Sequence, residues 1–288
     1  MNLGIFYYPW YGDANNAENA WRHWEDNGKS PPTTWNSKYM PTLGLYDSQT
    51  TDTVDSQMES IRNMGVDHVI WSWMGQDTFS DHSLSNWWTN GTNPSGLTHT
   101  IYYEKEWTEG PVTKADINSD IDYIKNNYAG SNSAPNSKWF RLNGKAVIYV
   151  YNVTPLAYKT QTDYQQKLSL KWSEVRVQKA IYTVLKVFSG WKDYARRSDS
   201  WHQYAPSTSY SRAGSYSSYV SPGFYYATDT NPRLSRDLTR FETNIKSLKN
   251  DGTPLKTIQT WNEWTEGTSV ESSTTWGSNY INIINKYF

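Results

Sequence analysis

The sequence predicts an α/β protein, a single (β/α)8 TIM barrel whose long loops after the strands form an aromatic-lined cleft. Three observations support this prediction: strand-like and helix-like segments alternate along the chain, two glutamates follow the last predicted strand, and the length fits. The 288 residues slightly exceed the about 250 that such a barrel typically takes. Because no linker and no internal repeat divides the chain, we expect residues 1–288 to form one domain.

The N-terminal part contains the first two predicted strands and a long loop. Residues 3–8 are an apolar run, and residues 9–50 are rich in Trp, Asn, Pro and Gly without periodicity. We therefore predict a strand followed by a long loop, which in a barrel carries binding residues. A helix that stops at Gly65 and a strand over 66–73 follow. The apolar stripe of this helix consists of Val54, Met58 and Ile61.

The same order of elements recurs further along the chain. A helical stripe precedes a predicted strand over 146–151, and another ends at Gly252 before a predicted strand over 257–261. A final helix is predicted over 278–287, whereas residues 182–188 fit either a strand or the end of a helix. The first stripe is Ile117, Ile121, Ile124 and Tyr128, and the second is Leu234, Leu238, Phe241, Ile245 and Leu248.

Composition favours an uncharged, polar partner. The 27 basic and 28 acidic residues form no long run of either sign, which argues against nucleic acid or an anionic membrane surface as the partner. No segment approaches the about 20 apolar residues of a membrane span. The 16 Trp and 23 Tyr far outnumber the 7 Phe, so most aromatic rings carry a polar group, as in sites that bind sugars.

The sequence also predicts the absence of a metal and of other cofactors. With no cysteine, disulfides and thiolate sites are excluded, and the five histidines lack zinc-ligand spacing. No phosphate-binding or dinucleotide-binding glycine motif is present. The first residues lack the basic region of a signal peptide, but the Ser, Thr, Asn and Tyr content is typical of extracellular proteins. We expect an extracellular or cell-surface location, with the cytoplasm as the alternative.

Two glutamates carry the predicted chemistry. Glu263 and Glu266 follow the last predicted strand, and the active site of a (β/α)8 barrel lies at the carboxyl ends of its strands. Cleavage of a glycosidic bond needs one carboxyl group as acid and a second as base or nucleophile. The neighbouring Trp261 and Trp264 would lower the local dielectric and raise a carboxyl pKa. We therefore predict Glu263 and Glu266 as the catalytic pair.

This stretch resembles the N-E-W-H-E-G-T-x-I-E motif of the endo-α-mannosidases of glycoside hydrolase family 99 and their relatives. Residues 262–268 and Glu271 carry the likeness, with Thr265 in place of the family's His. Further similar blocks follow in the family's order. They are Phe6 to Gly12, His23-Trp24, Tyr46-Asp47-Ser48, Trp71-Ser72-Trp73 with Gly75, Tyr103-Glu104, Asn143 to Tyr151, and Ser221 to Phe224.

The resemblance implies a retaining, metal-independent hydrolase that cuts α-mannosidic bonds inside an oligosaccharide or polysaccharide. It implies that Glu263 deprotonates the 2-hydroxyl of the sugar to give a 1,2-anhydro sugar, and that Glu266 is the acid/base. The matching blocks also supply candidate substrate-binding residues. These are Tyr8, Trp10, His23, Tyr46, Asp47, Trp73, Glu104, Tyr151, Asn262 and Glu271.

Two other functions remain open at this point. The chain could be a carbohydrate-binding barrel without catalysis, although it retains both Glu263 and Glu266. It could also be a transglycosylase that acts on a surface polysaccharide and transfers sugar to sugar instead of to water.

Overall fold

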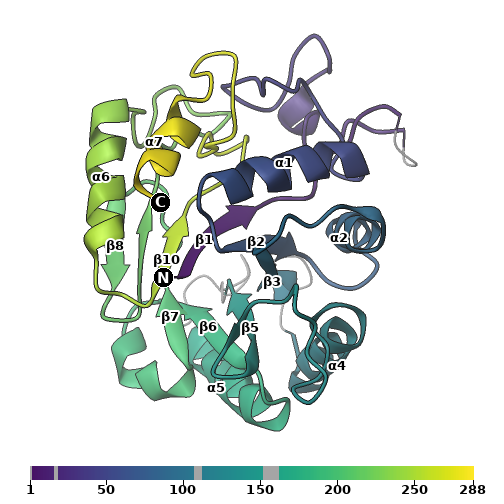
Figure 1. The fold of residues 1–288 in the computed structure, drawn as a ribbon, viewed down its shortest axis with the longest axis vertical. Helices are drawn as coiled ribbons and strands as arrows, with labels where there is room; N and C mark the ends of the chain where they lie inside the picture. The colour runs from purple at the N-terminus through teal and green to yellow at the C-terminus, as the bar shows by residue number, and fades with distance from the viewer. Residues whose placement is uncertain (1, 16–18, 107–111, 152–161) are drawn as a thin grey trace.

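The computed structural model describes residues 2–15, 19–106, 112–151 and 162–288, and it confirms the predicted barrel (Figure 1). Its ten-stranded sheet has the order β7-β6-β5-β3-β2-β1-β10-β9-β8, with β4 paired to β5. Only β4 and β8 pair in an antiparallel manner, and the other strands are parallel. The parallel strands are β1 (Asn2–Tyr7), β2 (His68–Trp73), β3 (Thr98–Tyr103), β5 (Lys145–Val150), β6 (Tyr182–Lys186), β7 (Ser200–His202), β9 (Ser217–Val220) and β10 (Leu255–Ile258).

The barrel closes between β7, the first strand of this order, and β9, the next to last. β7 and β9 lie next to each other, and the hydroxyl of Ser217 on β9 donates a hydrogen bond of 2.7 Å to the carbonyl of Trp201 on β7. The two strands are joined through the antiparallel strand β8 (Tyr210–Ala213) instead of through a helix. The middle of the chain therefore departs from a regular alternation of strand and helix.

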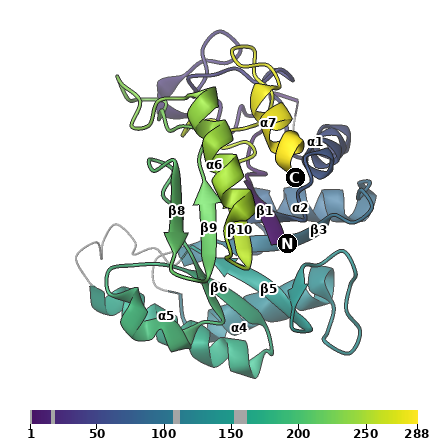
Figure 2. The same cartoon turned by 60° about the vertical axis from the view of Figure 1, so that its left-hand side comes forward.

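Helices surround the strands, and Figure 2 shows α6 and α7 packed against each other. They are α1 (Thr51–Asn63), α2 (Phe79–Asn90), α4 (Lys114–Ile124), α5 (Thr162–Gln178), α6 (Leu238–Asn250) and α7 (Asn279–Tyr287). Shorter elements are η1 (Asp26–Gly28), the π-helical η2 (Lys125–Ala129), η4 (Trp191–Arg197) and β4 (Arg141–Leu142). No helix within the described ranges is long and apolar enough to cross a membrane.

Three sequence expectations need correction or completion. Leu234 is not part of α6 but forms a β-bridge with Phe224, because the side chain of Asp237 caps the helix and starts it at Leu238. β10 ends at Ile258, three residues before the predicted end, so Trp261 lies beyond the strand. Residues 182–186 of the ambiguous segment form a strand, β6.

The barrel interior is filled by aromatic rings. Phe6 points inward from β1, and its ring centroid lies 4.8 Å from that of Tyr102 and 5.2 Å from that of Tyr204. Its neighbours Ile5 and Tyr7 belong to a separate cluster between the strands and the helices. Much of the Tyr and Trp content thus packs the core, and only the rings at the carboxyl ends of the strands are left for a ligand.

Candidate active site

The segment after β10 is fixed to the end of β1 by one asparagine. Asn262 accepts a hydrogen bond of 2.7 Å from the backbone N–H of Tyr8 and donates one of 3.0 Å to the carbonyl of Tyr8. The following turn closes when the N–H of Thr268 donates to the carbonyl of Glu263. Gly267 has φ +63°, and a Cβ there would lie 2.8 Å from the carbonyl oxygen of Tyr225. This turn therefore requires glycine and holds the two glutamates at the mouth of the barrel.

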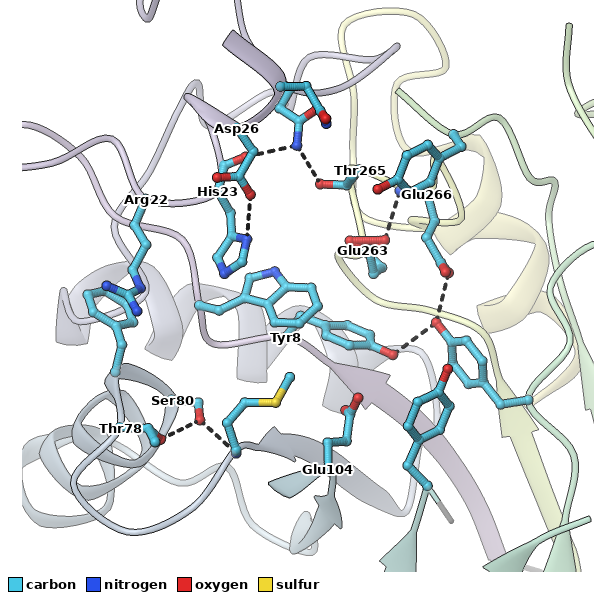
Figure 3. A pocket seen from close by; sticks show the side chains of 18 residues that line it. Tyr8, Arg22, His23, Asp26, Thr78, Ser80, Glu104, Glu263, Thr265 and Glu266 are labelled. Atoms are coloured by element: carbon cyan, nitrogen blue, oxygen red, sulfur yellow. Dashed lines mark hydrogen bonds and ion pairs between the residues drawn. The ribbon is translucent and has the colours of Figure 1, made fainter. Parts of the chain in front are cut away.

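Glu263 and Glu266 are connected through the backbone of the turn. The N–H of Glu266 donates a hydrogen bond of 2.8 Å to Oε2 of Glu263, and the N–H of Glu263 donates one of 2.8 Å to the hydroxyl of Thr260. Oε2 of Glu266 accepts a hydrogen bond of 3.0 Å from the hydroxyl of Tyr204. In Figure 3 both carboxylates lie on the same side of a pocket. Glu263 is buried and Glu266 half-buried.

Burial raises the pKa of both carboxyl groups. The pKa of Glu263 lies well above its usual range because of burial and the nearby charge of Glu266. Burial also raises the pKa of Glu266 to about 7, although the hydrogen bond from Tyr204 and the charge of Lys186 oppose this rise. Because neighbouring carboxylates resist being ionised together, near neutrality the pair holds a proton that can be donated and a carboxylate that can accept one.

The glutamates line a cavity of about 1020 Å³ at the carboxyl ends of the strands (Figure 3). The long loop after β1 forms much of the wall, and the ends of β1, β3 and β5 contribute to it. The lining residues are Tyr8, Trp10, Arg22, His23, Asp26, Asn27, Asn36, Met74, Thr78, Phe79, Ser80, Glu104, Tyr151, Tyr204, Tyr226, Glu263, Thr265 and Glu266.

Seven of the predicted site residues line this cavity. Besides the two glutamates of the turn, they are Tyr8, Trp10, His23, Glu104 and Tyr151. The ring of Trp10 lies 4.6 Å from the imidazole of His23, which is paired with Asp26 at 2.9 Å. This wall therefore combines aromatic faces with polar groups, as sugar-binding sites do.

Glu104 follows directly after β3 and is buried. Its Oε1 has no hydrogen-bond partner in the part of the chain that the structure describes. Burial raises the pKa of Glu104 to about 8, and the hydroxyl of Ser72 and the charge of Lys186 oppose this rise. Glu104 therefore brings a carboxyl group with a raised pKa to the wall of the cavity.

Tyr46, Asn262 and Glu271 do not line the cavity but form a buried network behind it. Glu271 accepts hydrogen bonds from the hydroxyl of Tyr46 at 2.9 Å and from the indole N–H of Trp264 at 3.1 Å. Its other oxygen accepts one from Gln57 at 2.7 Å. Asn262 in turn donates a hydrogen bond of 3.1 Å to the hydroxyl of Tyr46. The network fixes the turn that carries the two catalytic candidates.

Asp47 and Trp73 also lie outside the cavity lining. Asp47 accepts a hydrogen bond of 2.6 Å from the N–H of Gln49 in the turn before α1. Trp73 points outward from β2 toward the helices, and its indole N–H donates to Asp81 at 2.8 Å. Successive residues of a strand face opposite sides, so Ser72 occupies the inward position between the two outward tryptophans of β2. Trp73 therefore does not line the cavity, and its predicted contact with substrate stays a prediction.

Several residues that line the cavity were not predicted as site residues from the sequence. Tyr204 follows the three-residue strand β7, in a stretch for which the sequence predicted no strand or helix. Arg22, Asp26, Asn27 and Asn36 belong to the long loop after β1 and could be predicted only as loop residues. Asn36 donates a hydrogen bond of 3.3 Å to Thr265, the residue that replaces the family's histidine.

Structural comparison identifies proteins with the same fold. An endo-α-mannosidase of glycoside hydrolase family 99 from Bacteroides thetaiotaomicron matches with a TM-score of 0.74 and 17% identity, over 99% of this chain and 96% of that chain. Its complex with bis-tris propane matches with a TM-score of 0.73 and 17% identity, over 99% and 95%. A glycoside hydrolase-like protein matches with a TM-score of 0.64 and 15% identity, over 100% and 93%. No family model matches the sequence, and no curated protein matches it.

Proposed function

We propose that this protein is a glycoside hydrolase that cleaves α-mannoside-like bonds within a polysaccharide or glycan. One observation carries the proposal: Glu263 and Glu266 lie together in a cavity lined by aromatic and polar groups, and both have raised pKa values. An acid and a base within one sugar-sized site are what glycosidic cleavage requires. The fold shared with the B. thetaiotaomicron endo-α-mannosidase supports the α-mannoside part of the proposal.

We assign the two steps as follows. Glu263 takes the proton of the 2-hydroxyl, O2 attacks C1, and the bond from C1 to the leaving oxygen breaks while Glu266 protonates that oxygen. The product is a 1,2-anhydro sugar. Water then attacks C1 and gives its proton to Glu266, the C1–O2 bond breaks, and O2 regains a proton from Glu263. Two inversions at C1 give net retention, and attack from within the substrate avoids much of the entropic cost of a bimolecular step.

The size of the cavity supports cleavage inside a chain. Its volume of about 1020 Å³ is at the upper end of the about 300–1,000 Å³ of common ligand sites, which leaves room for more than one sugar ring. In Figure 3 Arg22 lies on the opposite side of the pocket from Glu263 and Glu266, so the loop after β1 extends the site away from the glutamate turn. We infer that the substrate is an extended glycan on or outside the cell.

The test is digestion of α-mannans, α-glucans and microbial surface polysaccharides by the wild type and by Glu266→Gln. Oligosaccharide products with retained anomeric configuration, absent with the variant, are expected. Release of monosaccharide alone would contradict cleavage inside the chain. Binding of a glycan without turnover would point to a carbohydrate-binding barrel, and longer products formed with an added acceptor sugar would point to a transglycosylase.

A further inference from the structure

A lysine that the sequence analysis did not single out lies beside two tyrosines that line the cavity, Tyr151 and Tyr204. Lys186 is the last residue of β6, and Tyr182 and Val184 of the same strand belong to the inner aromatic cluster. Alternation along the strand places Lys186 on this inward face, at the carboxyl end of the barrel. Its ammonium group lies 4.0 Å from the centre of the Tyr151 ring and 6.0 Å from that of Tyr204.

The rings of Tyr151 and Tyr204 both line the cavity, and each lies close to one of the carboxyl groups. Tyr151 lines the cavity directly after β5, beside Glu104 at the end of the neighbouring β3. Tyr204 donates a hydrogen bond of 3.0 Å to Glu266. The positive charge of Lys186 acts on both Glu104 and Glu266, and their negative charges act on it. The ring faces and the negative charges of the two carboxyl groups both offset part of the cost of burying the ammonium group.

We propose that Lys186, behind the rings of Tyr151 and Tyr204, is a positioning residue that supplies the positive charge balancing Glu104 and Glu266 in the cavity wall. This role rests on the proposed function, in which Glu266 is the acid/base. Without the lysine, the carboxyl groups of Glu104, Glu263 and Glu266 would repel one another without the positive charge of Lys186 to offset them. Repulsion would then leave the site with more protons, and Glu266 would act as a base only at higher pH.

Other titratable and charged groups also face Glu266, and they limit how far its pKa shifts when Lys186 is replaced. They come from every element packed around it. They are Glu263 on its own turn, Tyr8 after β1, Tyr102 on β3 and Glu104 after it, Tyr151 after β5, Tyr204 after β7, and Tyr226 and Arg233 between β9 and α6. Arg233 also bears a positive charge, but it is exposed and paired with Asp229 at 2.7 Å. Solvent and this partner weaken its influence, so Lys186 is the main opposing charge.

The direct test is a carboxyl ¹³C NMR titration of glutamate-labelled protein, with Glu266→Gln used to assign the signal. Lys186→Met keeps the apolar stem on the Tyr151 ring and removes only the charge. We expect the Glu266 pKa to rise by about one unit in this variant, the low end of the about 1–3 units that a nearby opposite charge produces. Lys186→Arg, which keeps the charge, should restore most of the wild-type value.

Lys138→Met is the matched control. Lys138 also lies over an aromatic ring, 5.8 Å from the centre of Trp88, but beside the start of β3 at the opposite end of the barrel. Its loss should leave the Glu266 titration unchanged. An unchanged Glu266 pKa in folded Lys186→Met would overturn the proposal, as would an equal shift in the control.

Two further measurements separate this inference from the proposed function. If the wild type cleaves no glycan, the hydrolase proposal fails, yet the NMR titration still decides the role of Lys186. If Lys186→Met does not fold, the reciprocal titration of labelled lysine replaces it. There the pKa of Lys186, about 8 in the wild type, should fall in Glu266→Gln and in Glu104→Gln. No fall in either variant would overturn the proposal.

Discussion

The hydroxyl of Tyr204 donates a hydrogen bond of 3.0 Å to Oε2 of Glu266 and accepts one of 2.9 Å from the hydroxyl of Tyr8. The three side chains thus form a continuous chain of hydrogen bonds across the cavity from the end of β1 to the turn after β10 (Figure 3). Because a hydrogen bond to a carboxylate favours its ionised form, Tyr204 opposes the rise in the Glu266 pKa that burial causes.

Tyr204→Phe should therefore raise the pKa of Glu266. A hydrogen bond to a charged group contributes about 1.5–3 kcal/mol and one pKa unit corresponds to about 1.4 kcal/mol, so a shift of about one unit is expected. The alkaline limb of kcat/KM, which reports an acid that must keep its proton, should move to higher pH by this amount. Tyr8→Phe removes only the outer hydrogen bond and should shift the limb less. An equal shift in both variants would contradict the direct role of Tyr204.

Replacement of either glutamate of the turn should abolish most turnover. Glu263→Gln and Glu266→Gln keep the size of the side chain but can neither accept nor donate the transferred proton. We expect kcat/KM to fall by about 10²–10⁴-fold in each, the usual contribution of a general acid or base. Calorimetric binding of a glycan should persist in both variants. Glu59→Gln on the exposed face of α1 is the control and should behave as the wild type.

The location of this site could be predicted from the sequence, because its two central residues lie three positions apart in one short segment. Glu263 and Glu266 share one turn after a strand, and the carboxyl ends of barrel strands form the active site. The inward or outward direction of Trp73 was harder to infer. Every residue of β2 is buried, since one face packs in the barrel and the other against helices, so the polar and apolar alternation that reveals direction is absent.

The roles of the remaining site residues could not be predicted, because they depend on contacts between segments that are distant in the sequence. Tyr204 reaches Glu266 from 62 residues away, across the irregular region between β6 and β9. Tyr46 contacts Glu271 over a separation of 225 residues, and the short blocks in which they occur suggested contact with substrate instead of with each other. Residue type and spacing identify such positions as polar and close to the site, but only packing decides which of them face the cavity.

Glu271→Ala should destabilise the fold. Removing this carboxylate leaves buried donors on Gln57, Tyr46 and Trp264 without their acceptor. Each unsatisfied buried group costs about 1–3 kcal/mol, so the free energy of unfolding should fall by roughly 3 kcal/mol or more. Urea denaturation measures this change, with Glu59→Ala as an exposed control. A loss of activity without a loss of stability would instead indicate that Glu271 acts on the substrate.

Glu106 should make the stability of the protein depend on pH. It is buried after β3, and Oε1 accepts a hydrogen bond of 3.1 Å from the indole N–H of Trp172 on α5. Burial raises its pKa from 4.5 to about 8. Between these two values the unfolded chain loses the proton while the folded protein keeps it, so this group lowers the free energy of unfolding as pH rises.

Glu106→Gln removes this titration but keeps an oxygen for Trp172. The variant should therefore gain stability relative to the wild type as pH rises from about 4.5 to about 8, because only the wild type then carries the cost of a buried, easily ionised group. Thermal unfolding of both proteins across this range measures the difference. Other buried carboxyl groups titrate equally in both proteins, so they cancel in the comparison. A difference in stability that stays constant with pH would show that Glu106 keeps an ordinary pKa in the folded protein.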